Sequence, residues 1–199
     1  MHEPRGKVGL GLSYAITPRG ANHMEGLHDT MLEQDSPTPE LGVVSRYDRF
    51  SLEGKAQLVV LYENLRSFVN SLVMCAFTTR ETGPRYNFPK IRELLAYATG
   101  LEIGPEEMLQ IGARNFALMR LYSGLCGYTK AEDRLPQRFH EPLPRGASGG
   151  RPIDPELFRK EIDVYYRLRG WDECGPTRET LERLGLSDLI PMLSSKAKA

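Results

Sequence analysis

Apolar side chains recur at intervals of three and four residues between positions 52 and 73, and this spacing limits the fold more than any other feature of the sequence. An α-helix has 3.6 residues per turn, so the spacing places these side chains along one helix face. The stripe is the longest in the chain and consists of Leu58, Leu61, Leu65, Phe68, Val69 and Leu72. It predicts a long amphipathic helix over residues 52–73 at the centre of the fold.

The rest of the chain carries start and stop signals for further helices and no alternating strand pattern longer than about four residues. Proline near the first turn and glycine after the last turn are typical helix boundaries. They predict helices over residues 89–99, 105–122, 155–169 and 177–185, and an extended surface loop over residues 130–153. The fold class is therefore predicted to be all-α, with one helical domain over residues 1–193 and a frayed tail over residues 194–199.

Composition excludes several classes of partner. The 26 basic residues balance the 26 acidic residues of this 199-residue chain, so no net charge attracts it to nucleic acid or to an anionic membrane. No apolar stretch approaches the ~18 residues of a membrane span, and the N-terminal residues lack the apolar core of a signal peptide. We expect a cytoplasmic protein whose three cysteines are reduced, because their number is odd and their spacing is wide.

Individual residues allow both structural and functional interpretations. The glycine-rich segment GKVGLG, residues 6–11, lacks the spacing of a dinucleotide-binding motif. Arg19 and His23 form an arginine and histidine pair that could bind an anion and transfer a proton, although each residue type is also common on surfaces. Cys75 is either a small residue packed in the core or a metal ligand.

Three blocks of sequence together resemble one enzyme family. They are EPRGKVGLGLSYAITPRGANH at residues 3–23, LPQRF with EPLP at residues 135–144, and IDVYYRLRGWDECGPTRETLERLGL at residues 162–186. In content and order they are similar to the C-terminal part of the tungsten-dependent aldehyde ferredoxin oxidoreductases. The resemblance runs from about residue 3 to residue 190 and implies the last helical domain of that family.

The resemblance implies a cofactor site at the end of the 52–73 helix. The family uses a tungsten bis-pterin cofactor and a 4Fe-4S cluster, and an Asp-x-x-Gly-Leu-Cys motif binds a pterin through its aspartate and the cluster through its cysteine. NSLVMC, residues 70–75, lies at the equivalent place. Cys75 matches the metal ligand, whereas Asn70, Val73 and Met74 replace the aspartate, glycine and leucine. Asn70 and Met74 are therefore the candidate cofactor-binding residues of this motif.

The RGANH segment matches a second family site. The resemblance assigns cofactor binding to Arg19 and makes His23 the candidate catalytic proton donor. Relatives often place a basic pterin contact two residues after the histidine, where this chain has Glu25. A carboxylate there would repel a pterin phosphate.

The remaining cluster ligands of the family are absent from this sequence. The CxxCxxxC arrangement that supplies three further cysteines is not found, and one thiol cannot hold a four-iron cluster. Cys126 aligns with a stretch that has no ligand role, so we expect it to be structural. Cys174 stands in the WDECGPT turn, where the family usually has a small polar residue, and is not expected to bind iron either. The isolated chain is expected to bind neither the complete cofactor nor the cluster.

Two functions remain open from the sequence. In the first, the chain completes an oxidoreductase that converts aldehydes to carboxylic acids with ferredoxin as electron acceptor, together with a separate chain that carries the β domain and CxxCxxxC. In the second, it is a non-catalytic helical remnant or interaction module that retains the fold without the cofactor. The aldehyde and the choice of tungsten over molybdenum stay open.

Overall fold

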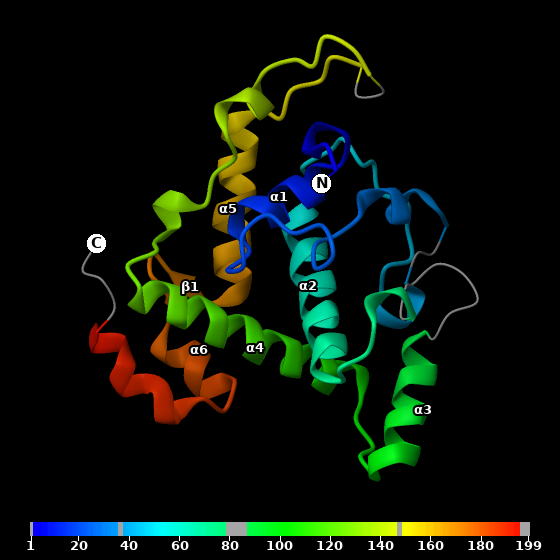
Figure 1. The fold of residues 1–199 in the computed structure, drawn as a ribbon, viewed down its shortest axis with the longest axis vertical. Coiled ribbons are helices and arrows are strands. Elements are labelled where there is room, and N and C mark those ends of the chain that lie inside the picture. The colour runs from blue at the N-terminus through cyan, green and yellow to red at the C-terminus, as the bar shows by residue number, and fades with distance from the viewer. Residues whose placement is uncertain (1, 36–37, 79–86, 147–148, 196–199) are drawn as a thin grey trace.

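The computed structural model describes residues 2–35, 38–78, 87–146 and 149–195 (Figure 1). Its α-helices are α1 (Val8–Ile16), α2 (Lys55–Ser71), α3 (Phe88–Thr99), α4 (Pro105–Leu125), α5 (Pro155–Arg169) and α6 (Arg178–Arg183). Within the described residues, the only strands are β1 (Trp171–Asp172) and β2 (Gly175–Pro176), which pair as a short antiparallel hairpin. The predicted all-α fold class is confirmed.

Helix α2 is the central element, as its apolar stripe predicts. It contacts α1, α4 and α5, and Ala56 and Val59 are completely buried on it. The helix begins at Lys55 rather than near residue 52 because Gly54 precedes it in the left-handed conformation, with φ of 70°. Its last turn ends at Ser71, just before the segment expected to carry the cofactor ligand.

Helix α1 was not predicted, because its glycines conceal a helix that is apolar on every side. All nine of its residues are buried, as is typical of a helix in the middle of a core. It lies between α2 and α5 in Figure 1 and contacts both. At Gly9, a Cβ atom would lie 2.8 Å from a carboxylate oxygen of Asp29, so glycine is needed for this close approach.

Asp29 completes the N-terminus of α1 from a distant segment. Its carboxylate accepts hydrogen bonds from the backbone N–H groups of Gly9 and Leu10, both at 2.9 Å. The ammonium group of Lys55 lies 3.0 Å from the same carboxylate. A buried carboxylate is stable here because it meets both the positive end of the helix dipole and a cation. The backbone N–H groups of the glycine-rich segment therefore bind an internal anion, the Asp29 carboxylate.

Helix α4 crosses α2 at Gly112. A Cβ atom at this position would overlap the backbone carbonyl of Asn64 in α2, so the two helices touch through their backbones. Near its other end, Gly124 meets the carbonyl of Cys174 in the turn between β1 and β2 in the same way. Helix α4 continues three residues past the predicted end at 122, to Leu125.

A buried ion pair joins α5 to α2. The guanidinium of Arg169 lies 2.9 Å from the Glu63 carboxylate, and its other nitrogen donates to Asn64. The hydroxyl of Tyr165 donates to the same Glu63 oxygen at 2.7 Å. Burial raises the pKa of the Glu63 carboxyl, and the positive charge of Arg169 lowers it in part. The pair fixes the angle at which α5 packs.

A second buried ion pair holds the long loop against α4. Arg120 donates two hydrogen bonds of 3.1 Å to the Asp133 carboxylate, and the Tyr166 hydroxyl from α5 donates to the same group. Burial and the nearby Asp133 charge raise the pKa of Tyr128 to about 12. The loop over residues 130–153 has no strand among its described residues, and it contains short 3-10 helices at Lys130–Glu132 and Gln137–His140.

The last of the described residues form a further 3-10 helix at Ser187–Ser195. Two residues of the predicted frayed tail, 194 and 195, therefore belong to this helix, and residues 196–199 lie outside the described residues. None of the helices in the described ranges combines the length and the apolar character needed to cross a membrane.

Candidate functional site

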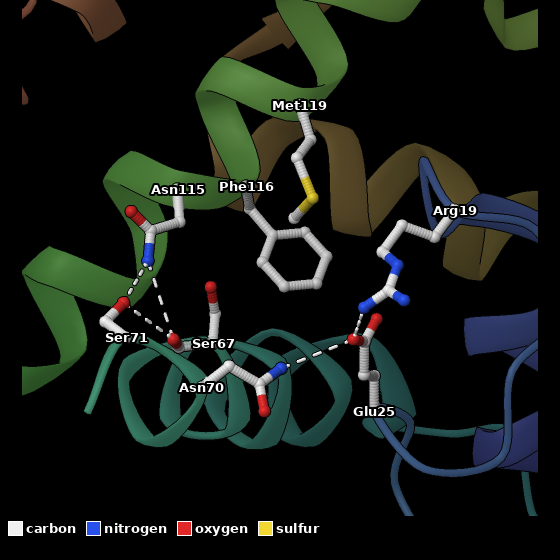
Figure 2. Close-up of a pocket in the computed structure, with 8 residues that line it drawn as sticks. All are labelled: Arg19, Glu25, Ser67, Asn70, Ser71, Asn115, Phe116 and Met119. Atoms are coloured by element: carbon white, nitrogen blue, oxygen red, sulfur yellow. Dashed lines mark hydrogen bonds and ion pairs between the residues drawn. The ribbon is translucent and has the colours of Figure 1, made fainter. Parts of the chain in front are cut away.

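A pocket of about 270 Å³ lies between α2, α4 and the loop that follows α1 (Figure 2). The loop contributes a charged pair, α2 contributes polar side chains, and α4 contributes an amide and an apolar wall. The lining residues are Arg19, Glu25, Ser67, Asn70, Ser71, Asn115, Phe116 and Met119. The pocket therefore combines Arg19 and Asn70, which are 51 positions apart in the sequence and were both predicted to bind a cofactor.

Glu25 occupies the middle of this charged end of the pocket. It forms an ion pair with Arg19, and the side-chain N–H of Asn70 donates to the same carboxylate oxygen at 3.3 Å. The Arg19 side chain is 54% exposed, whereas that of Glu25 is 12% exposed. The carboxylate is thus held inside the pocket while the arginine reaches it from the rim, as Figure 2 shows.

The neutral end of the pocket was missed from the sequence. The Asn115 amide donates to the Ser71 hydroxyl at 2.7 Å and approaches the Ser67 carbonyl at 3.5 Å. Positions 115 and 116 lie three and four residues after position 112, and position 119 lies four and three residues after them, so all four lie on one face of α4. That spacing was visible in the sequence. It did not predict a pocket wall, because this face becomes a wall only where α4 approaches α2 at Gly112.

His23 does not line this pocket. Its ring lies among histidines, with the His2 ring centroid at 5.4 Å and the His28 ring centroid at 6.4 Å. The Nε2–H of His28 donates to the His23 carbonyl at 2.6 Å, and Lys7 donates to the other ring nitrogen of His28 at 3.3 Å. These contacts fix the backbone that presents His23. Its catalytic role stays a prediction.

Met74 and Cys75 follow the end of α2 and also lie outside the pocket lining. Met74 is half-buried and packs against the core, which leaves its predicted cofactor contact untested. Cys75 is exposed, so the alternative of a small residue packed in the core is wrong. Its role as a metal ligand stays a prediction.

The other two cysteines differ in exposure. Cys126 directly follows α4 and is exposed, so its thiol is not packed in the core. The expectation that it has no ligand role stays a prediction. Cys174 is partly buried in the hairpin turn, where its backbone touches Gly124.

Thiol labelling of the native chain tests these placements. We expect Cys75 and Cys126 to react quickly and Cys174 more slowly, because modification requires access to the thiolate. Mass spectrometry after short exposure to iodoacetamide measures the three rates separately. A Cys75 that reacts only after denaturation would contradict the exposed placement.

Val73 adopts a backbone conformation that glycine favours. Its φ is 57°, in the left-handed region, and its side chain is 93% exposed. It is the residue directly after the C-cap of α2, where helices commonly end in this conformation. The family motif has glycine at the equivalent place, so the structure gives a physical reason for that glycine and supports the alignment of residues 70–75.

The substitution Val73→Gly is expected to stabilise the chain. The left-handed conformation costs a residue with a Cβ atom about 1–2 kcal/mol, whereas glycine loses about 0.5–1 kcal/mol through its more flexible unfolded state. The free energy of unfolding should rise by about 0.5–1 kcal/mol in a urea titration. Val44→Gly is the matched control, because Val44 is also exposed and has no positive φ. It should bring no gain, and an equal gain in both variants would refute the explanation.

The donor set does not fit the family's metal centres by itself. Across the described ranges, no group of three or more His, Cys, Asp and Glu side chains is arranged to hold a metal ion. At the expected pterin contacts, Glu25 already pairs with Arg19, and Asn70 donates to Glu25. The chain alone thus offers one candidate ligand thiol, that of Cys75, and a pocket whose cation has an internal partner.

Comparison with known proteins gives the family. The family model described as aldehyde ferredoxin oxidoreductase, domains 2 & 3, matches residues 1–186. A tungsten-containing aldehyde ferredoxin oxidoreductase of Pyrococcus furiosus is 33% identical over 192 residues, which cover 94% of this chain and 29% of the relative. The enzyme of that name from Thermococcus kodakarensis is 31% identical over 95% of this chain and 30% of its own length. The chain therefore spans less than a third of these relatives.

Two further matches extend the comparison. The WOR-like subunit of an aliphatic sulfonate oxidoreductase from Pyrococcus furiosus is 35% identical over 63% of this chain and 20% of its own length. The active-site complex BamBC of benzoyl coenzyme A reductase, solved with 1,5-dienoyl-CoA, shares the fold with a TM-score of 0.58 and 23% identity. That match covers 74% of this chain and 21% of the solved one. By sequence, the chain belongs to the aldehyde ferredoxin oxidoreductase family and matches its domains 2 and 3.

Proposed function

We propose that this chain supplies the C-terminal helical part of a cytoplasmic oxidoreductase that converts an aldehyde and water to a carboxylic acid. The two electrons released would pass to ferredoxin. The observation that carries the proposal is the convergence of Arg19 and Asn70 on one pocket, in a chain whose family match runs over residues 1–186. These two residues come from separate family motifs. They lie in different elements, the loop after α1 and helix α2, so local structure does not bring them together.

The proposal includes a second chain. The curated relatives are more than three times as long as their matched part, since that part is 29% or 30% of their length. We infer a partner that carries the β domain and the CxxCxxxC cysteines. Cys75 would complete the partner's cysteine set, because an exposed thiol after a helix end is accessible to another chain.

One observation favours the alternative of a non-catalytic helical module. The Glu25 carboxylate engages both Arg19 and Asn70, so the residues that resemble pterin contacts are already bound to an internal carboxylate. A chain that lost the cofactor could keep such a pocket as part of its packing. The two functions differ in whether metal accompanies the chain when its partner is present.

Co-expression with a chain that carries the β domain and CxxCxxxC tests the proposal. We expect a stable complex that contains tungsten or molybdenum together with iron and sulfide, and that reduces ferredoxin when an aldehyde is added. Elemental analysis measures the metals independently of activity. Cys75→Ser should lower the iron content, whereas the control Cys126→Ser, which removes another exposed thiol, should not. A complex that forms without metal would support the module instead.

A further inference from the structure

We propose that Glu25 determines the charge selectivity of the pocket between α2 and α4, acting as an internal anion that excludes anionic ligand groups from Arg19. The inference concerns the same pocket and goes beyond the proposed function, because it states which ligand charge the pocket of this chain admits. It does not require that the chain be part of an enzyme, because the exclusion is a property of the isolated chain.

The inference rests on the charged residues that line the pocket. Arg19 is the one cationic residue of the lining and Glu25 the one anionic residue, and they form an ion pair. The remaining polar side chains are hydroxyls and amides, from Ser67, Asn70, Ser71 and Asn115. The lining therefore has no net charge, and its only group suited to bind phosphate through a planar fork is already occupied.

The loop that carries Glu25 is fixed in place. The neighbouring Gly26 packs so closely on α1 that a Cβ atom would lie 2.8 Å from Leu10 and 2.9 Å from Ser13. On the other side, the Met24 N–H donates to the Asn22 side chain at 2.9 Å. The Asn70 amide then holds the carboxylate from α2. The loop is thus held on both sides of Glu25, whereas the Arg19 side chain is more exposed than that of Glu25.

Exclusion follows from simple electrostatics. An anion that approaches Arg19 must share the guanidinium with a carboxylate a few ångströms away. Unit charges at such a distance interact strongly enough to change an affinity by about tenfold, even near a solvated surface. Removal of the Glu25 charge should therefore increase phosphate binding by about tenfold or more. The arginine, released from its internal partner, would then bind the added anion.

The test is anion binding by the isolated chain, with pyrophosphate as the probe and isothermal titration calorimetry as the measurement. Glu25→Gln should bind pyrophosphate about tenfold or more tightly than the unaltered chain. The double variant Arg19→Gln with Glu25→Gln should lose this gain, which would assign it to the guanidinium. Glu102→Gln, which removes an exposed carboxylate outside the pocket lining, should behave as the unaltered chain.

Two results would overturn the inference. One is an affinity of Glu25→Gln within about twofold of the unaltered chain, with its thermal unfolding unchanged. The other is a gain that persists in the double variant. Because no metal, partner or aldehyde enters the measurement, its failure is distinct from failure of the proposed function, which rests on the metal content of the co-expressed complex.

Discussion

The substitution Gly112→Ala is expected to lower the free energy of unfolding by about 3 kcal/mol. Alanine favours an isolated helix over glycine by about 1 kcal/mol, so helix propensity alone predicts stabilisation. The new Cβ atom would, however, overlap the Asn64 carbonyl of α2, which is backbone and cannot rotate away. Forcing α2 and α4 apart disturbs the core around them, and this overpacking outweighs the gain in propensity.

Thermal and urea unfolding measure this effect. The midpoint temperature should fall by about 6–12 °C for a chain of this size. The control is Gly6→Ala, because Gly6 has no atom within 4 Å of the added Cβ and no positive φ. Its stability should change by at most about 0.5 kcal/mol. A Gly112→Ala variant as stable as the control would show that α4 does not cross α2 at this glycine.

The substitution Arg169→Met is expected to cost about 3–5 kcal/mol near pH 8. Methionine keeps much of the side-chain volume but leaves the Glu63 carboxylate buried without its cation, and a buried charge that loses its partner is strongly destabilising. The Tyr165 hydroxyl would still donate to Glu63, although one neutral hydrogen bond does not replace an ion pair. Urea titrations at several pH values measure the loss.

The loss of stability in Arg169→Met should depend on pH, in a direction that the protonation of Glu63 sets. Burial raises the pKa of Glu63 above its unfolded value, and removal of Arg169 raises it further. The folded variant therefore binds more protons than the unfolded chain, so its stability decreases as the pH rises through the folded pKa. The loss should be smaller near pH 5 than near pH 8. The double variant Glu63→Gln with Arg169→Met should remove this dependence, and a loss independent of pH would contradict the assignment to Glu63.

Sequence periodicity was sufficient for the helices that face the core on one side only. The stripe of α2 and the boundary residues of α5, where Asp154 accepts from the first-turn N–H groups and Gly170 follows the helix in the left-handed conformation, could be recognised from the sequence. Helix α1 could not, because it is buried on every side and two of its nine residues are glycines. Its N-terminal partner, Asp29, depends on tertiary packing that no local pattern specifies.

The candidate site was predictable only in part, for a related reason. The family resemblance identified Arg19 and Asn70, and the structure places both in one pocket. It identified Glu25 as a repulsive charge, but the ion pair that makes this carboxylate an internal partner of Arg19 depends on the folded loop. Asn115 was missed because its role arises from the crossing of two helices.

We propose that this chain presents Cys75 to a partner that carries the remaining cluster cysteines, and thiol labelling of the assembled complex tests this proposal. Cys75 and Cys126 are both exposed in the chain alone, so each serves as a reference for the other. The account predicts that the partner protects Cys75 from iodoacetamide while Cys126 reacts as before, and that removal of iron restores the reactivity of Cys75. A complex in which Cys75 reacts as quickly as in the isolated chain would contradict the account.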